Sequence, residues 1–273
     1  MCDIKGCGNQ RKLPPIRISN SERRLFLKGL ISLPLATVLA YPELARAMAD
    51  GTQTVMIKTQ SGQKVSAALA MPDAKKAPCI LLIHEWWGLN DQIRSVAVEF
   101  SKLGYFALAV DLYGGEIADS PESARALMQN VDPNIATDIL VSWIDYLKKS
   151  PSSTSKVGTV GWCFGGGWSL NASLATPVDA TVIYYGNVRK TAENLASLQS
   201  PVLGHFATRD GWINQDMVSS FEMAMQNAGK SELTVHWYEA DHAFANPTNA
   251  RYDADDAALS WDRTVQFFNK NLG

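Results

Sequence analysis

The sequence predicts an α/β fold in which a mostly parallel, doubly wound sheet of about eight strands carries helices on both faces. Apolar or β-branched runs of strand length recur along the chain, and stretches with helical spacing separate most of them. Runs such as Ile80–Ile83 are apolar throughout. A strand that helices cover on both faces needs such a run, which is typical of the centre of a parallel sheet.

The alternation begins near residue 52 and continues to the end of the chain. Strand-like runs occupy 54–59, 65–71, 79–84, 106–111, 157–162, 180–185, 202–207 and 233–238. Helical spacing occurs at 91–103, 121–129, 133–149, 166–175, 213–228 and 253–270. The polar residues 60–63 predict an antiparallel hairpin between the first two strands. The later strands, most of which are joined to the next through a helix, predict right-handed βαβ units in one domain, with 151–155 as a loop.

The first 49 residues are expected to be an export signal, and the folded domain is expected to span 50–273. Arg23 and Arg24 precede a modest apolar stretch, as in twin-arginine signals. Two overlapping small-x-small triplets within 45–49 offer cleavage sites. The expected location is therefore the periplasm or another exported compartment, with the twin-arginine export machinery as partner. The alternative is a short amphipathic helix that packs on the domain.

Charge and composition argue against several classes of function. Residues 1–47 carry eight Lys and Arg against three acids, which leaves 17 bases against 24 acids in the rest of the chain. Such an acidic domain has no general attraction for phosphates, so nucleic-acid binding is not expected. No run of 18 apolar residues is present, so no permanent membrane anchor is expected. The absence of Cys-x-x-Cys and of zinc-type spacing argues against a metal.

The most informative motif is Gly-Trp-Cys-Phe-Gly-Gly at 161–166. A β-branched strand precedes it and helical residues follow, which is the context of a nucleophile elbow with Cys163 in place of the more frequent serine. Gly161 and Gly165 would let neighbouring chain approach a strained turn. The N-terminus of the next helix would favour the thiolate. Taken alone, the motif also fits a glycine-rich turn with a buried cysteine, as Cys79 is expected to be in its apolar run.

Two later strands end close to residues that could complete a catalytic triad. Asp210 follows the run 202–207, and His242 follows 233–238. Nucleophile, acid and histidine, each after its own strand, is the chain order of α/β-hydrolases. Each residue alone is more typical of a turn or a solvated loop, but together they predict that Cys163 attacks an acyl carbon, His242 acts as the base and Asp210 orients it.

Several motifs together carry a family resemblance. They are His-Glu-Trp-Trp-Gly-Leu-Asn at 84–90, Asp-Leu-Tyr at 111–113, the cysteine motif, Asp210 and His-Ala-Phe at 242–244. Residues 52 to 271 therefore resemble the dienelactone hydrolase (carboxymethylenebutenolidase) family of the α/β-hydrolase superfamily. The resemblance implies cleavage of a carboxylic ester or lactone through an acyl-enzyme, without a cofactor.

The same resemblance implies roles for residues around the triad. Glu85 would hold the resting thiol until substrate binds, because a buried carboxylate near a thiol opposes thiolate formation. A structural acid bonded to loop amides is the alternative for that residue. The backbone N–H groups of Phe164 and Trp86 would form the oxyanion hole. The aromatic residues expected to line the substrate pocket are Trp87, Tyr113, Trp162 and Phe244.

Two arginines that grip the carboxylate of the family's namesake substrate have no counterpart in this sequence. One follows the Asp-Leu-Tyr motif in the family and the other follows His-x-Phe, whereas 114–116 are Gly-Gly-Glu here and 245–247 are Ala-Asn-Pro. Neither Gly nor Asn replaces a bidentate guanidinium, so a less anionic ester or lactone is expected. Two other functions stay open: a thioesterase or acyl transferase on the same triad, and a non-catalytic binding module on a hydrolase scaffold.

Overall fold

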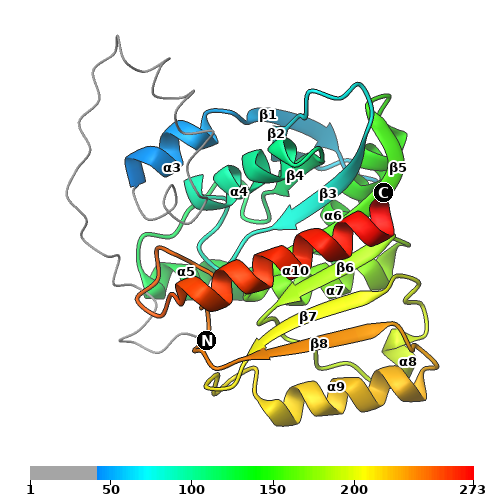
Figure 1. The fold of residues 1–273 in the computed structure, drawn as a ribbon. Coiled ribbons are helices and arrows are strands. Elements are labelled where there is room, and N and C mark those ends of the chain that lie inside the picture. Colours follow the sequence, from blue (N-terminus) through cyan, green and yellow to red (C-terminus); the bar gives the residue numbers. More distant parts are fainter. Residues whose placement is uncertain (1–41) are drawn as a thin grey trace.

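The computed structural model describes residues 42–273. One sheet contains β1 (Gln53–Lys58), β2 (Lys64–Ala70), β3 (Ala77–Ile83), β4 (Phe106–Val110), β5 (Ser153–Trp162), β6 (Ala180–Tyr184), β7 (Val202–Ala207) and β8 (Leu233–Tyr238). The helices are α3 (Pro42–Ala49), α4 (Asp91–Lys102), α5 (Pro121–Gln129), α6 (Pro133–Lys149), α7 (Phe164–Ala175), α8 (Ala192–Leu195), α9 (Gln215–Asn227) and α10 (Ala254–Leu272). These elements confirm the predicted α/β fold (Figure 1).

The sheet is ordered β1-β2-β4-β3-β5-β6-β7-β8. Strand β2 pairs antiparallel with β1 and with β4, and every other pairing is parallel. The predicted opening hairpin is confirmed, and its turn is closed by Thr59, whose N–H donates to the Gln63 carbonyl. Because β3 to β8 run the same way, their carboxyl ends meet at one edge, where open sheets of this kind bind ligands.

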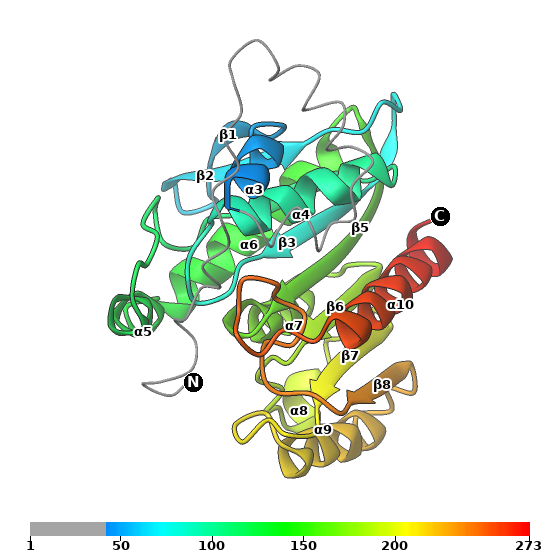
Figure 2. The ribbon, with the colours of Figure 1, turned by 60° about the vertical axis from the view of Figure 1, so that its left-hand side comes forward.

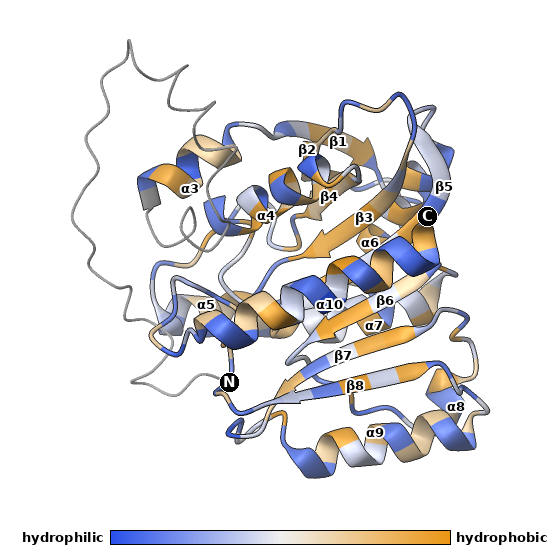
Figure 3. Cartoon of the chain, in the orientation of Figure 1, coloured by the Kyte–Doolittle hydropathy of each residue, from blue (hydrophilic) through white to orange (hydrophobic). Residues whose placement is uncertain are grey.

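Helices cover both faces of the sheet, and β3 shows why. Ile80 and Leu82 pack into the cluster that includes α4 and α10, whereas Cys79, Leu81 and Ile83 pack into the one that includes α6 and α7. Successive side chains of a strand point to opposite faces, so an all-apolar strand must be covered twice. Figures 1 and 2 show α4 and α10 on the same side of the sheet, and Figure 3 shows the apolar central strands.

Two segments differ from the sequence prediction. Strand β5 begins at Ser153, inside the predicted loop, because Ser153 pairs with Ala77 before a register shift in the β3–β5 pairing. The one-turn helix α8 was not predicted; it begins with a capping box in which Thr191 and Asn194 bond each other's backbone.

Helix α3 overlaps the end of the predicted export signal. Leu44, Ala45, Met48 and Ala49 are buried, and Ser95 Oγ on α4 donates to the Ala45 carbonyl at 2.7 Å. Residues 1–41, which contain the twin arginines, lie outside the described residues. Within 42–273 no helix is both long enough and apolar enough to cross a membrane.

Candidate active site

The cysteine motif forms a sharp turn between β5 and α7. Cys163 is the N-cap of α7 with φ 54° and ψ −116°, a conformation that costs a side-chain-bearing residue energy. A Cβ at Gly161 would lie 2.0 Å from the Gly165 carbonyl oxygen, and one at Gly165 would lie 2.2 Å from that of Ile83. Only glycine fits either position, as the sequence predicted, and the packed backbone holds the thiol beyond the end of β5.

A chain of buried hydroxyl groups fixes α7 behind this turn. Ser169 Oγ donates to Thr159 Oγ1 at 2.9 Å, and Ser173 Oγ lies 2.6 Å from Thr181 Oγ1. Thr181 in turn lies 2.7 Å from Ser200 Oγ. These bonds tie the helix to β5 and β6, so the start of α7 has little freedom to move relative to the sheet.

His242 and Asp210 form a buried pair after β8 and β7. His242 Nδ1 lies 2.5 Å from Asp210 Oδ2, and both residues are at most 4% exposed. Asp210 Oδ1 accepts the backbone N–H groups of Trp212 and Ile213 at 2.9 and 3.1 Å. Burial alone would raise the pKa of Asp210, but the hydrogen bonds and the charge of His242 hold that pKa below its ordinary value. The carboxylate is therefore charged and oriented toward the imidazole.

Cys163 and His242 line one cavity of about 640 Å³. His242 Nε2 is buried and has no hydrogen-bond partner of good geometry among the described residues. Burial would lower the pKa of His242, but its interaction with Cys163 and the hydrogen bond and charge of Asp210 raise that pKa to about 10. Nε2, the ring nitrogen that Asp210 does not contact, is therefore the one that lies near Cys163. The structure therefore brings Cys163, His242 and Asp210, the three residues of the predicted triad, to one place.

A family comparison matches most of this domain. The model of the dienelactone hydrolase family matches residues 65–272. The chain belongs to the dienelactone hydrolase family. This confirms the resemblance and the prediction of a carboxylic ester or lactone hydrolase.

Two relatives and one solved structure show how far the similarity extends. Protein usf of Aquifex pyrophilus is 30% identical, over 78% of this chain and 96% of its own length. Carboxymethylenebutenolidase of Pseudomonas putida is 29% identical, over 79% and 95%. The structure of a dienelactone hydrolase-like promiscuous phosphotriesterase from metagenomic libraries superposes with a TM-score of 0.73 at 22% identity, covering 82% of this chain and all of that one. This last likeness concerns the fold alone.

Glu85 lies next to this site and is 4% exposed. Its Oε2 accepts Asn246 Nδ2 at 2.6 Å, and its Oε1 accepts the Tyr185 hydroxyl at 3.4 Å. Burial raises the pKa of Glu85, and the Asn246 bond, the charge of His242 and the Tyr185 bond partly offset that rise. Among the described residues no hydrogen bond joins this carboxylate to Cys163, so a role in holding the thiol stays a prediction.

The predicted oxyanion donors lie in the cavity wall. Trp86 and Phe164 both line it, and neither backbone N–H donates to an acceptor within 42–273. His84 braces this loop, because its Nδ1 lies 2.5 Å from the Glu85 carbonyl and its Nε2 accepts the Leu112 N–H at 3.2 Å.

The aromatic residues expected to line the substrate pocket are spread over several places. Tyr113 is buried beside Phe164 with its ring centroid 5.7 Å away, and its hydroxyl has no partner among the described residues. Trp87 packs on Trp86 at 5.1 Å. Phe244 is fully buried in the core cluster, and Trp162 lines a different cavity. None of the four is in the wall of the Cys163 cavity.

Sequence reasoning missed two cations in the cavity wall. Arg189 and Lys190 line it, together with the amides of Asn171 and Asn187, and the wall contains no Asp or Glu. Neither cation forms an ion pair within the described part of the chain. Their position shortly after the carboxyl end of β6 was the available signal. Nowhere in 42–273 do three His, Cys, Asp or Glu residues gather as metal ligands would.

Proposed function

We propose that the protein hydrolyses a carboxylic ester or lactone through a Cys163 acyl-enzyme. The sulfur attacks the carbonyl carbon, His242 Nε2 takes the thiol proton and returns it to the leaving alkoxide oxygen as the C–O bond breaks. Water then attacks the thioester, His242 accepts its proton, and the acid leaves as the thiol is restored. Asp210 keeps Nδ1 protonated, so that Nε2 is the nitrogen that exchanges the proton.

The observation that carries this proposal is that Nε2 of the buried His242 has no hydrogen-bond partner within the described residues, and that His242 lines the same cavity as Cys163. Buried polar atoms almost always have partners, and those that do not often mark catalytic sites. The pKa of His242 is raised by its interactions with Cys163 and Asp210, which supports a close approach of the imidazole to the sulfur. The Phe164 and Trp86 N–H groups are suited to receive the negative oxygen, each such donor being worth about 3–4 kcal/mol in the transition state.

Tyr113 adds a further donor near the reacting sulfur. Burial raises the pKa of its hydroxyl, and the charge of Cys163 raises it further. The group therefore stays protonated and lies within electrostatic reach of the thiolate. Its hydroxyl has no partner within the described residues, and because the side chain lies outside the wall of the Cys163 cavity, we assign it an electrostatic effect on the sulfur rather than a contact with the substrate.

We assign Glu85 to the control of thiol reactivity. Tyr185 supports this role, since its pKa is raised by burial and then by the charges of both Glu85 and Cys163. One buried hydroxyl thus lies within reach of both anions. A carboxylate held by Tyr185 and Asn246 repels charge that forms on the sulfur, and substrate that displaces either partner would change that repulsion.

The substrate is proposed to carry an anionic group in addition to the scissile ester. The expectation of a less anionic substrate rested on the lack of arginine at 114–116 and 245–247. Arg189 and Lys190 supply positive charge from a different part of the chain, in the wall of the Cys163 cavity. Burial lowers the pKa of Lys190, which is the behaviour of an ammonium without an anionic neighbour. A wall with two cations and no carboxylate raises the local concentration of anionic ligands.

The test is hydrolysis of p-nitrophenyl acetate and of mono-p-nitrophenyl succinate by the full chain. Cys163→Ala should abolish both rates, and Cys163→Ser should retain a small fraction. Arg189→Ala should raise the KM for the succinate ester about tenfold and leave the acetate KM within twofold. Equal slow turnover by wild type and Cys163→Ala would point instead to a binding module. If wild type hydrolyses the acetate ester normally and Arg189→Ala has the same KM for the succinate ester as wild type, only the proposal of an anionic substrate would be overturned.

We further propose that the protein is exported through the twin-arginine pathway. Arg23 and Arg24 ahead of an apolar stretch support this proposal. A free reactive thiol also suits a route that typically carries folded passengers, since Cys79 and Cys163 form no disulfide within the described residues.

A further inference from the structure

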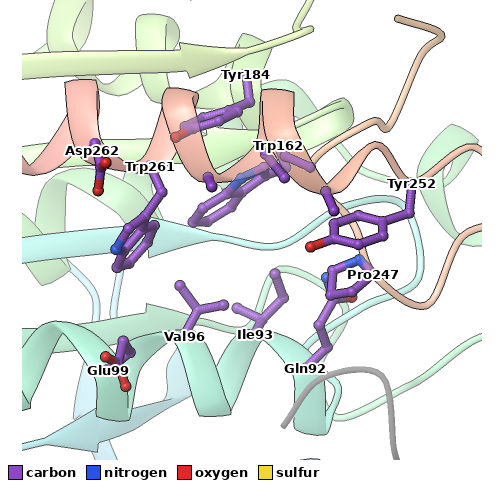
Figure 4. Close-up of a pocket in the computed structure, with 14 residues that line it drawn as sticks. Gln92, Ile93, Val96, Glu99, Trp162, Tyr184, Pro247, Tyr252, Trp261 and Asp262 are labelled. Carbon is purple, nitrogen blue, oxygen red and sulfur yellow. The ribbon is translucent and has the colours of Figure 1, made fainter. Parts of the chain in front are cut away.

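A second cavity of about 320 Å³ lies on the other side of the sheet from the Cys163 cavity. Helix α4 forms one wall and α10 the other, and the segment 245–252 closes one end (Figure 4). The two helices meet where Phe100 packs on Trp261, with ring centroids 4.7 Å apart. No residue lines both cavities. The space is therefore a separate site at the small end of the range for ligand pockets, about 300–1,000 Å³.

Four aromatic rings face this cavity. Trp162 stacks on Tyr184 with centroids 5.5 Å apart, and Trp261 is held by its contact with Phe100. The Tyr184 hydroxyl is 2.9 Å from the Ser260 carbonyl and 2.7 Å from Thr264 Oγ1. Tyr252 is the fourth ring and lies opposite Trp261 in Figure 4. Rings fixed by such neighbours offer their faces to a ligand without first having to be ordered.

The charged groups of the wall are both acids. Glu99 and Asp262 line the cavity, and no Lys, Arg or His does so. Lys102 offsets Glu99 at 3.0 Å from outside the wall. Asp262 forms no ion pair within 42–273. Burial raises the pKa of the Tyr184 hydroxyl, and the negative charge of Asp262 adds to that rise. Asp262 is therefore an exposed carboxylate without an ion-pair partner at the rim of the cavity, beside the aromatic rings.

We propose that this cavity binds a small organic cation with an apolar or aromatic body. An ammonium group is attracted to the faces of Trp and Tyr rings, and the carboxylate of Asp262 adds to that attraction. The alanine and aliphatic side chains of α4 and α10 suit the apolar body. An anion of the same size would meet Asp262 without a basic partner. Because the Cys163 cavity carries Arg189 and Lys190, the two cavities select opposite charges.

The experiment is calorimetric titration of the full chain with benzyltrimethylammonium, and with phenylacetate as an anion of similar size. The ammonium ion should bind saturably at one site and phenylacetate should not bind there. Asp262→Asn, which keeps the shape of the wall, should weaken the ammonium ion about fivefold. Asp255→Asn changes an exposed acid of the same helix outside the wall and should have no effect.

Two further measurements separate this cavity from the hydrolytic one. Ala257→Phe fills the space and should abolish binding, whereas Cys163→Ala should bind the ammonium ion as wild type does. The KM for p-nitrophenyl acetate should not change when the ammonium ion is present. Absence of saturable binding, tighter binding of phenylacetate, unchanged affinity in Asp262→Asn, or competition with the ester would each overturn the proposal.

Discussion

Replacing Asp210 by asparagine tests the proposed triad most directly. The two oxygens of this carboxylate have different partners, because one bonds backbone N–H groups and the other bonds His242. Oδ1 holds the backbone N–H groups of Trp212 and Ile213, and the amide oxygen of asparagine can still accept both. Oδ2 accepts from His242 Nδ1 at 2.5 Å, and the amide NH₂ would instead present a donor there. The variant should therefore fold but hold His242 in the tautomer whose Nε2 already carries a proton.

The expected loss in kcat/KM is about 10³ to 10⁴-fold. The buried charged hydrogen bond contributes about 1.5–3 kcal/mol. The wrong tautomer removes the acceptor for the thiol proton, and in another enzyme family the corresponding Asp-to-Asn change lowers kcat about 10⁴-fold. A 10³ to 10⁴-fold loss is about 4–5.5 kcal/mol of barrier.

The assay is steady-state hydrolysis of p-nitrophenyl acetate from pH 5 to 9, with thermal unfolding as the test of folding. Asp241→Asn is the matched control, since Asp241 precedes His242 but is about half exposed and its one ion-pair partner within 42–273 is Arg209, at 3.6 Å. It should stay within twofold of wild type. An Asp210→Asn enzyme within tenfold of wild type across this range would refute the assignment of Asp210 as the orienting acid.

Three other tests have definite outcomes. The pKa of Glu85 is raised on folding, so the stability linked to its proton is complete below pH about 4.3 and is lost as pH rises through the folded pKa. The melting temperature of Glu85→Gln, measured relative to wild type, should therefore be higher at pH 8 than at pH 4.5. A difference in melting temperature between the two proteins that stays the same at both pH values would contradict this. Gly165→Ala should cost about 3 kcal/mol and most of the activity, because the new Cβ would lie 2.2 Å from a backbone oxygen, whereas Gly211→Ala, with nothing within 4 Å, should unfold in urea as wild type does. Arg23→Lys combined with Arg24→Lys should leave the protein in the cytoplasmic fraction on cell fractionation; normal export of that variant would exclude the twin-arginine route.

Much of the fold could be predicted because its signals are local. All-apolar runs such as Ile80–Ile83 must be buried on both faces, and the spacing of apolar residues in α6 is helical over four turns. The start of β5 at Ser153 could not be read in this way. That strand end depends on pairing with Ala77, about 75 positions earlier, and its own residues are polar and partly exposed.

The residues of the site likewise fall into those that the sequence predicts and those that it does not. Cys163, Asp210 and His242 are marked by strand ends and glycines, which are visible in sequence. Arg189 and Lys190 carry no such mark, since a basic pair after a strand is usually solvated, and only the packing of α7, α9 and the β6–α8 segment gives them a shared wall with the thiol. Phe244 shows the reverse case, because an aromatic residue two positions from His242 turns into the core.

The crowding around Gly161 and Gly165 has a consequence for how this enzyme can diverge. Two positions of the turn accept no side chain at all, so neither natural mutation nor laboratory selection can move Cys163 by substitution at these positions. New substrate preferences must instead arise elsewhere in the cavity wall, in α7 and in the segments that follow β3, β6 and β7. Libraries for altered specificity should therefore randomise 187–190 and 211–214 and leave 161–166 untouched.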